Sequence, residues 1–302
     1  MAVDILTALS LTQTQVLDRL TYCIIEPSAS RRQWQSNRLA LFSKQIAWFE
    51  SWDCLNREKA RSFKTLRGIQ FSNELLDAFP VDRWKWIKST QSWVRLGVCW
   101  AENQFQWADG LDRIPVESPS ALSSISEVPQ PIIPRELLDV LPDGFILEKS
   151  PLAMDWWSRA LASLDEGWCI CVDYGLSTHE FLVPQRANGT LRAFRNHRRC
   201  TDPLASPGSQ DLTASVDFTR LRETGEAQGY ATEYDNSQRV WLTHIFERAC
   251  AMSAESPSSW TLRQLRQFQT LIHPEHLGRA FRVLVQKRIS PSNTLFAKGQ
   301  SP

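Results

Sequence analysis

The first part of the chain alternates apolar and polar segments in a helix–strand–helix–strand order. Residues 1–11 place apolar side chains at the spacing of one face of an amphipathic helix. Residues 20–25 are a short run of apolar residues and strand formers, typical of a strand buried on both faces of a parallel sheet. A helical stretch follows, and residues 45–49 form the next apolar run. This order predicts a β–α–β unit of an α/β fold.

A further predicted strand, residues 68–72, runs directly into a group of polar side chains. Asn73, Glu74 and Asp77 follow it closely and are interleaved with apolar residues. Polar residues at the carboxyl ends of strands mark where open α/β sheets bind ligands. This strand end is therefore a candidate site.

The middle of the chain changes to an antiparallel pattern. Residues 84–107 alternate aromatic or aliphatic side chains with polar ones around a turn at 101–103, which predicts a β-hairpin. Residues 115–134 hold many prolines and serines and few large apolar residues, and we expect a surface loop there.

The second half returns to helices and strands. Residues 150–164 predict a helix that closes at Gly167, and residues 168–172 predict a strand that ends at Asp173 and Tyr174. Residues 176–215 lack a regular pattern, which in a compact domain usually indicates a functional loop.

The end of the chain is predicted to be helical, with one closing strand. Asp217 is a suitable N-cap for a helix that stops at Gly229. Helical patterns at 238–252 and 262–271 precede a final strand at 280–287.

Composition and charge narrow the range of functions. The 302 residues are 42% hydrophobic and 22% charged, as in ordinary globular proteins. A net charge of +1, spread along the chain, argues against nucleic-acid partners and anionic membranes. No apolar run reaches the roughly 18 residues that span a bilayer, and the start of the chain lacks the regions of a secretory signal. We therefore expect a cytoplasmic protein that binds a small ligand or a protein.

No metal site is predicted. The seven cysteines lack the spacing of a zinc site or a disulfide framework. Cys169 and Cys171 point to one face of a predicted strand, and we interpret them as buried core thiols. Residues His179, His244, His273 and His276 show no spacing with carboxylates that suggests a metal, and His197 lies among arginines as a surface or hydrogen-bonding residue.

Two groups of side chains are candidates for ligand chemistry. Glu26 follows a predicted parallel strand, where a carboxylate can accept both hydroxyls of a ribose, although a solvated turn is the commoner role. Asn73 and Glu74 can orient an amine or guanidinium. Methyl transfer from a sulfonium requires such orientation, because the nucleophile must lie in line with the methyl group. The alternative is a helix N-terminus with acidic residues that suit its dipole, in which Asp77 caps the turn.

Several ordered segments carry a resemblance to a known family. They are Ile-Ile-Glu-Pro-Ser at 24–28, Ser-Asn-Glu-Leu-Leu-Asp-Ala-Phe-Pro-Val at 72–81, Gly-Trp-Cys-Ile-Cys-Val-Asp-Tyr-Gly at 167–175, and shorter matches at 190–192, 197, 203–204, 207–208, 211–218 and 278–284. In order and spacing they resemble the MidA family of methyltransferases, whose mitochondrial members assist the assembly of respiratory complex I.

The resemblance implies an α/β fold of the class I methyltransferase type. This is a Rossmann-like sheet, here with its first strand missing, with helices on both faces, an inserted β-hairpin and helical insertions. It also implies S-adenosyl-L-methionine as the cofactor and a protein substrate, methylated on arginine in the mitochondrial branch. Residues 190–217 correspond to a substrate region of that family.

The predicted site residues follow from the pattern and the resemblance together. We predict Asn73, Glu74 and Asp77 as catalytic, Glu26, Ser28 and Asn73 as cofactor-binding, and Asp173, Tyr174, Arg192, His197, Asp211, Thr213 and Asp217 as substrate-binding. We expect a single methyltransferase-like domain over residues 1–302, incomplete at its N-terminus. Its expected parts are a partial cofactor-binding half at 1–81, a hairpin insertion at 82–114, a loop at 115–149, and a second half at 150–302 with the substrate region at 176–217.

The chain departs from the family at its start. Family members carry an acidic, glycine-rich loop after their first strand, and this chain begins at the helix that follows the loop. Two hypotheses remain: a methyltransferase whose full gene product includes the loop, or a non-catalytic remnant or assembly factor that binds protein through residues 176–217. We expect the bacterial cytoplasm as the compartment, or the mitochondrion if the source is eukaryotic.

Overall fold

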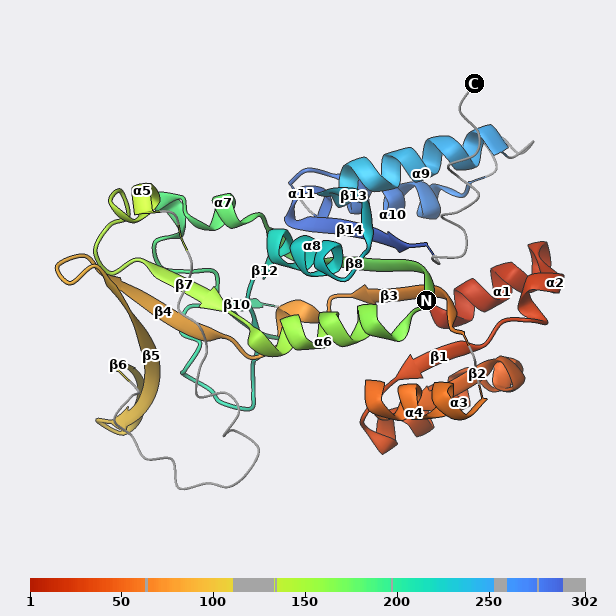
Figure 1. Ribbon diagram of the computed structural model, residues 1–302, viewed down its shortest axis with the longest axis horizontal. Coiled ribbons are helices and arrows are strands. Elements are labelled where there is room, and N and C mark those ends of the chain that lie inside the picture. The colour runs from red at the N-terminus through yellow and green to blue at the C-terminus, as the bar shows by residue number, and fades with distance from the viewer. Residues whose placement is uncertain are drawn as a thin grey trace. The chain divides into compact units, whose positions relative to one another are not determined.

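The computed structural model describes residues 1–62, 65–110, 133, 135–196, 198–252, 260–275 and 277–289. These residues form two compact units. Unit 1 comprises Met1–Arg67 and Ala162–Glu166, and unit 2 comprises the remainder. Figure 1 traces the elements of both. The loop expected at residues 115–134 lies outside the described residues, apart from Ile133.

Unit 1 has the predicted helix–strand–helix–strand order. Its helices are α1 (Ala2–Thr12), α2 (Thr14–Leu17), α3 (Ala29–Arg38), η1 (Ala40–Gln45) and α4 (Trp52–Ser62), and its strands β1 (Tyr22–Ile25) and β2 (Ile46–Phe49) pair in parallel. Buried Leu6, Leu17 and Leu39 form its core. The expectation that the first strand is buried on both faces is wrong, because Cys23 is exposed. Within the described residues, β1 pairs only with β2.

Unit 2 contains a five-stranded sheet that carries the candidate site. Its strands are β3 (Arg67–Asn73), β8 (Glu166–Leu176), β12 (Val216–Asp217), β13 (Ala231–Ser237) and β14 (Phe281–Arg288). The order is β12-β8-β14-β13, and β3 also pairs with β8. The apolar runs predicted at residues 68–72, 168–172 and 280–287 are confirmed as strands of this sheet.

Helices cover both faces of the five-stranded sheet. On one face, Val172 and Val283 pack with Trp241 of α9 (Gln238–Met252) and Leu277 of α11 (Leu277–Ala280). On the other, Gln286 of β14 donates a hydrogen bond to the carbonyl oxygen of Arg222 in α8 (Phe218–Ala227). The remaining helices are α6 (Pro151–Ser163), which adjoins α8, and α10 (Leu262–Ile272), which adjoins α9 and α11. Among the described helices, none is long and apolar enough to cross a membrane.

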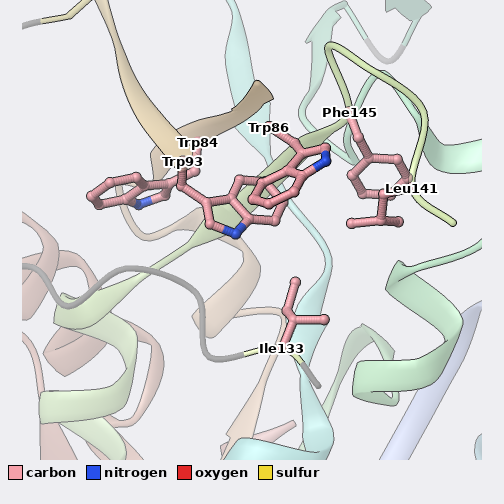
Figure 2. Packing of buried hydrophobic residues seen from close by; sticks show 6 residues of the cluster. All are labelled: Trp84, Trp86, Trp93, Ile133, Leu141 and Phe145. Carbon is pink, nitrogen blue, oxygen red and sulfur yellow. The ribbon is translucent and has the colours of Figure 1, made fainter. Parts of the chain in front are cut away.

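A four-stranded antiparallel sheet forms the second part of unit 2. Its order is β6 (Gln104–Asp109), β5 (Ser92–Ala101), β4 (Asp82–Ile87) and β7 (Ile146–Lys149), so the predicted hairpin is confirmed. Figure 2 shows its core, in which Trp84, Trp86 and Trp93 lie near Leu141 and Phe145. Strand β7 and helix α5 (Arg135–Leu138) fall in the range 115–149 that was expected to be loop. Both elements have only four residues, too few to display a period.

Residues 176–215 are more regular than expected. They contain α7 (Thr178–Phe181), η4 (Pro184–Arg186) and a three-stranded sheet of β10 (Arg198–Cys200), β9 (Arg192–Arg195) and β11 (Asp211–Thr213). Cys169 and Cys171 are fully buried, which confirms them as core thiols. Burial raises the pKa of Cys169 to about 12, so its thiol stays protonated.

Candidate functional site

The turn that follows β3 has an unusual backbone. Strand β3 ends at Asn73, and Glu74 has a φ of 48°, in the left-handed region that non-glycine residues rarely occupy. The Glu74 N–H donates to the carbonyl oxygen of Val172 in β8 at 3.0 Å, and the 3-10 helix η2 (Leu76–Ala78) follows. A non-glycine residue persists in this conformation only where its surroundings hold it there, which is commonest at functional sites.

Asp173 holds this turn in place. Its side chain is fully buried, and one carboxylate oxygen accepts the backbone N–H groups of Leu75 at 3.1 Å and Leu76 at 2.8 Å. The other oxygen accepts the N–H of Tyr174 at 2.8 Å. A carboxylate with these partners stabilises the turn between Asn73 and Asp77, because it satisfies backbone donors that would otherwise be buried without an acceptor.

Asp77 and Asp173 form a buried carboxyl pair. Asp77 is 5% exposed and its carboxyl group lies next to that of Asp173. Burial and the neighbouring carboxylates raise the pKa of both groups, that of Asp173 to about 7. Two neighbouring carboxylates are costly when both ionise, so the pair keeps one proton until the pH approaches about 7. We call Glu74, Asp77 and Asp173 the acidic cluster.

Tyr174 and Arg192 lie next to the acidic cluster. The Arg192 guanidinium lies over the Tyr174 ring at 5.2 Å from its centroid, and it attracts the charge of Asp77. Burial and the charge of Glu74 raise the pKa of Tyr174, so its hydroxyl stays protonated. The structure therefore brings together Glu74, Asp77, Asp173, Tyr174 and Arg192, all of which were predicted site residues.

The carboxyl pair makes stability depend on pH. Because the pKa of Asp173 is raised from about 4 in the unfolded chain to about 7 in the folded one, the folded state binds the extra proton. The free energy of unfolding therefore falls as the pH rises through this window, by about 2 kcal/mol between about pH 5 and pH 8. Asp173→Asn keeps an oxygen acceptor for the backbone N–H groups but cannot ionise, and we expect it to remove most of this fall. Urea denaturation of both proteins at about pH 5 and about pH 8 measures this fall in the free energy of unfolding.

The matched control for this measurement is Asp139→Asn, which changes an exposed carboxylate in the same unit. It should keep the wild-type dependence on pH. A fall in stability that persists unchanged in Asp173→Asn would mean that the carboxyl pair is not its source.

Three other predicted substrate residues have structural contacts. Asp217 is the N-cap of α8, where it accepts the N–H of Arg220 at 3.2 Å and the Thr178 hydroxyl at 3.1 Å, as its predicted capping role requires. Asp211 and Thr213 lie on β11, which pairs with β9, and Asp211 is exposed. His197 lies outside the described residues.

Glu26 and Ser28 belong to unit 1 and are described within it. Glu26 follows β1, and its carboxylate accepts the Ser28 N–H at 2.9 Å and the Gln35 side-chain amide at 3.4 Å. The Ser28 hydroxyl caps α3 by accepting the N–H of Arg31. Glu26 thus makes the contacts expected of a carboxylate in a turn. Each of its oxygens also keeps a lone pair that can accept a hydrogen bond from a ribose hydroxyl.

Sequence reasoning missed a buried anchor of the substrate region. Glu148 is 8% exposed, and it accepts the Thr190 N–H at 2.7 Å, the Thr190 hydroxyl at 3.2 Å and the Arg83 Nε at 3.1 Å. It also lies against Gly189, whose φ is 80°. No sequence signal marks Glu148, because it lies in a four-residue strand between hydrophobic and polar neighbours.

Comparison with known proteins decides the family. Residues 1–234 match the protein family described as "Putative S-adenosyl-L-methionine-dependent methyltransferase". The chain belongs to this family. S-adenosyl-L-methionine is the cofactor that the family's description gives, and the predicted MidA resemblance is confirmed.

Relatives and solved structures agree with the family. The chain is 29% identical over 151 residues to the mitochondrial protein arginine methyltransferase NDUFAF7 of Rattus norvegicus, which covers 49% of this chain and 31% of the relative. It is 31% identical over 119 residues to that of Danio rerio, which covers 39% and 26%. The chain thus spans less than a third of the length of these curated relatives.

Two structures of COG1565 superfamily proteins from Burkholderia thailandensis share the mixed α/β fold. One is an uncharacterized member, with a TM-score of 0.67, 25% identity, and coverage of 89% of this chain and 66% of that one. The other is described as a likely methyl transferase bound to S-adenosyl-homocysteine, with a TM-score of 0.65, 25% identity, and coverage of 89% and 64%.

Proposed function

We propose that this chain contributes the catalytic face of an S-adenosylmethionine-dependent methyltransferase that acts on arginine side chains of a protein. The observation that carries the proposal is the acidic cluster at the end of β3 and β8, in a chain that belongs to a methyltransferase family. The relatives from Rattus norvegicus and Danio rerio are named protein arginine methyltransferases, which favours arginine as the acceptor. A class I, Rossmann-like assignment of the fold is part of the same proposal.

Each unit, taken by itself, contains residues whose chemistry suits a part of the cofactor. In unit 1, the Glu26 carboxylate keeps acceptor capacity for the ribose hydroxyls, and Ser28 fixes the adjoining turn. In unit 2, the exposed Asn73 ends β3 and its side-chain amide donates a hydrogen bond to Glu74 at 3.5 Å. When bound, S-adenosylmethionine supplies a methyl group on a sulfonium that needs no acid to make it reactive.

The acidic cluster has the chemistry that an arginine acceptor requires. A guanidinium is a poor nucleophile because its lone pairs are delocalised and it stays protonated. Glu74 is the exposed carboxylate of the cluster, so it can pair with the incoming guanidinium and take the proton that the acceptor nitrogen loses. The raised pKa of the Asp77–Asp173 pair favours a single negative charge on the pair, which is buried, whereas Glu74 is exposed and can reach the acceptor.

The remaining predictions about the site belong to this proposal. Asp211, Thr213 and Asp217 would contribute to a substrate region at residues 176–217, and residues 1–81 to the cofactor-binding half. The curated relatives are named mitochondrial, and the compartment of this protein stays a prediction.

Binding of S-adenosylhomocysteine tests the proposal. We expect calorimetric titration to detect binding by the chain, and Glu26→Ala to raise the Kd about 10-fold, because it removes a charged acceptor for the ribose. The matched control is Glu247→Ala, which removes an exposed glutamate of α9 and should bind as the wild type does. Mass spectrometry of arginine peptides incubated with S-adenosylmethionine then detects the methylated product.

Two outcomes would count against methyl transfer. If the folded chain shows no heat of binding at millimolar S-adenosylhomocysteine, the alternative of a non-catalytic protein that acts by binding is favoured. If it binds but leaves arginine, lysine and histidine peptides unmodified, the acceptor assignment is wrong.

A further inference from the structure

A cavity beside the acidic cluster has the opposite charge. It measures about 680 Å³ and lies at the carboxyl end of β8, where Tyr174 and Ser215 form part of its wall. Its lining contains five arginines and one carboxylate, Glu180. The arginines are Arg186, Arg192, Arg199, Arg279 and Arg282.

Among the residues that line the cavity, most of this positive charge has no counter-charge, and the charge of Asp77 attracts Arg192 from outside the lining. Glu180 accepts a hydrogen bond from Arg282 at 2.9 Å and is also bound by the Ser177 hydroxyl and N–H. Arg282 pairs in addition with Asp235 at 2.9 Å. In the part of the chain that the structure describes, the other four arginines of the lining form no ion pair. The one carboxylate of the cavity is therefore already engaged, and an excess of positive charge faces the open space.

Arg192 lines the cavity and has two side-chain nitrogens without a partner. Its Nε and Nη2 are buried and have no hydrogen-bond acceptor among the described residues. These two nitrogens lie on the same side of the guanidinium, and their parallel N–H groups match the two oxygens of a carboxylate. Buried donors without acceptors cost free energy, so the site is arranged for an acceptor that arrives with a ligand.

The support of Arg192 is rigid. Its guanidinium lies over Tyr174, whose ring packs on buried Phe281 with centroids 4.1 Å apart. Arg192 begins β9, directly after the Thr190 segment that Glu148 holds. A Cβ on Gly189 would lie 2.1 Å from the Glu148 Oε1, so this approach needs glycine. A guanidinium fixed in this way loses little entropy when it binds a planar anion.

We propose that the arginine cavity binds an aspartate or glutamate side chain of the protein substrate, close in sequence to the residue that is methylated. This rests on the proposed function. The cavity repels a cationic acceptor, which the neighbouring acidic cluster attracts. A substrate with a basic and an acidic residue near each other satisfies both sites, so the cavity selects substrates by their acidic residue.

Binding without cofactor tests this inference separately from methyl transfer. The probes are a fluorescein-labelled peptide that contains arginine and glutamate, and its twin with glutamine in place of glutamate. We expect the wild-type chain to bind the glutamate peptide about 10-fold more tightly in fluorescence anisotropy. Arg192→Met should bring the two affinities within about 2-fold of each other.

The matched control is Arg195→Met on the same strand. Residues three apart on a strand point to opposite faces, and Arg195 is exposed and absent from the cavity lining. It should keep the preference for glutamate. Arg199→Met, which also removes a cavity arginine, should weaken the preference and provides a second variant if Arg192→Met does not fold.

Three results would overturn the inference. The first is equal binding of the two peptides by the wild-type chain, and the second is an equal loss of preference in Arg195→Met. The third is Arg192-dependent binding of a phosphoserine twin that is tighter than binding of the glutamate peptide, which would make phosphate the ligand. A chain that binds the glutamate peptide through Arg192 but transfers no methyl group would sustain the inference and contradict the proposed function. If the chain binds the two peptides equally and methylates both, the inference is contradicted and the proposed function is sustained.

Discussion

Glu74→Gln is expected to lower kcat for methyl transfer by about 100-fold or more, because the acceptor loses both its counter-ion and its proton acceptor. Glutamine has nearly the same shape, so the backbone hydrogen bond from residue 74 to Val172 should remain. Glutamine cannot take a proton at neutral pH. The variant therefore removes the charge of the turn and leaves its geometry.

The measurement separates chemistry from cofactor binding. Initial rates with an arginine peptide give kcat, and calorimetric titration with S-adenosylhomocysteine gives the Kd, which we expect to stay within about 2-fold of the wild-type value. Glu247→Gln, a change of the same kind at an exposed position of α9, should leave both unchanged. A Glu74→Gln chain that keeps its kcat would show that this carboxylate takes no part in the reaction.

The position of Glu74 depends on a residue far along the chain. Asp173 accepts hydrogen bonds from Leu75 and Leu76, which are 98 and 97 residues away in sequence. The strained φ of 48° at Glu74 is thus maintained by a buried carboxyl on the neighbouring strand. Asp173 was predicted to bind substrate, which remains untested. The structure adds a positioning role that local sequence could not reveal.

The sequence identified several of the longer elements from the period or run of their apolar residues. The helix predicted at 238–252 matches α9, and the strand predicted at 168–172 is the centre of β8, whose buried side chains largely alternate. Strand β13 was missed because its sequence, Ala-Thr-Glu-Tyr-Asp-Asn-Ser, is mostly polar. It forms because it pairs along β14, and only Tyr234 packs in the core behind it. Tertiary pairing there overrides local propensity.

The candidate site was predictable in part. Glu74 and Asp77 were found because polar residues at a strand's carboxyl end mark ligand sites in α/β folds. The arginine cavity was not, since its arginines come from η4, β9, β10, α11 and β14. Arg192 and Arg199 lie on β9 and β10, strands of four and three residues whose place is set by pairing partners and not by a hydrophobic period.

The start of β8 contains a glycine that leaves no room for a side chain. Gly167 has a φ of 129°, and a Cβ there would lie 1.9 Å from the carbonyl oxygen of Gly68 in β3. Gly167→Ala must therefore separate the backbones of the two strands that carry the acidic cluster. We expect it to lower the free energy of unfolding by about 3 kcal/mol or more, from backbone strain and overpacking together. Urea denaturation followed by tryptophan fluorescence measures it.

Gly208→Ala separates the two causes of this loss. Gly208 also has a positive φ, 75°, but a Cβ there would meet nothing within 4 Å. Its replacement should cost only the backbone strain, about 1 kcal/mol. The difference between the two variants then measures the close approach of β3 to β8. Equal losses in both would mean that the strands can move apart at no cost, and that the β3–β8 pairing does not fix the geometry of the acidic cluster.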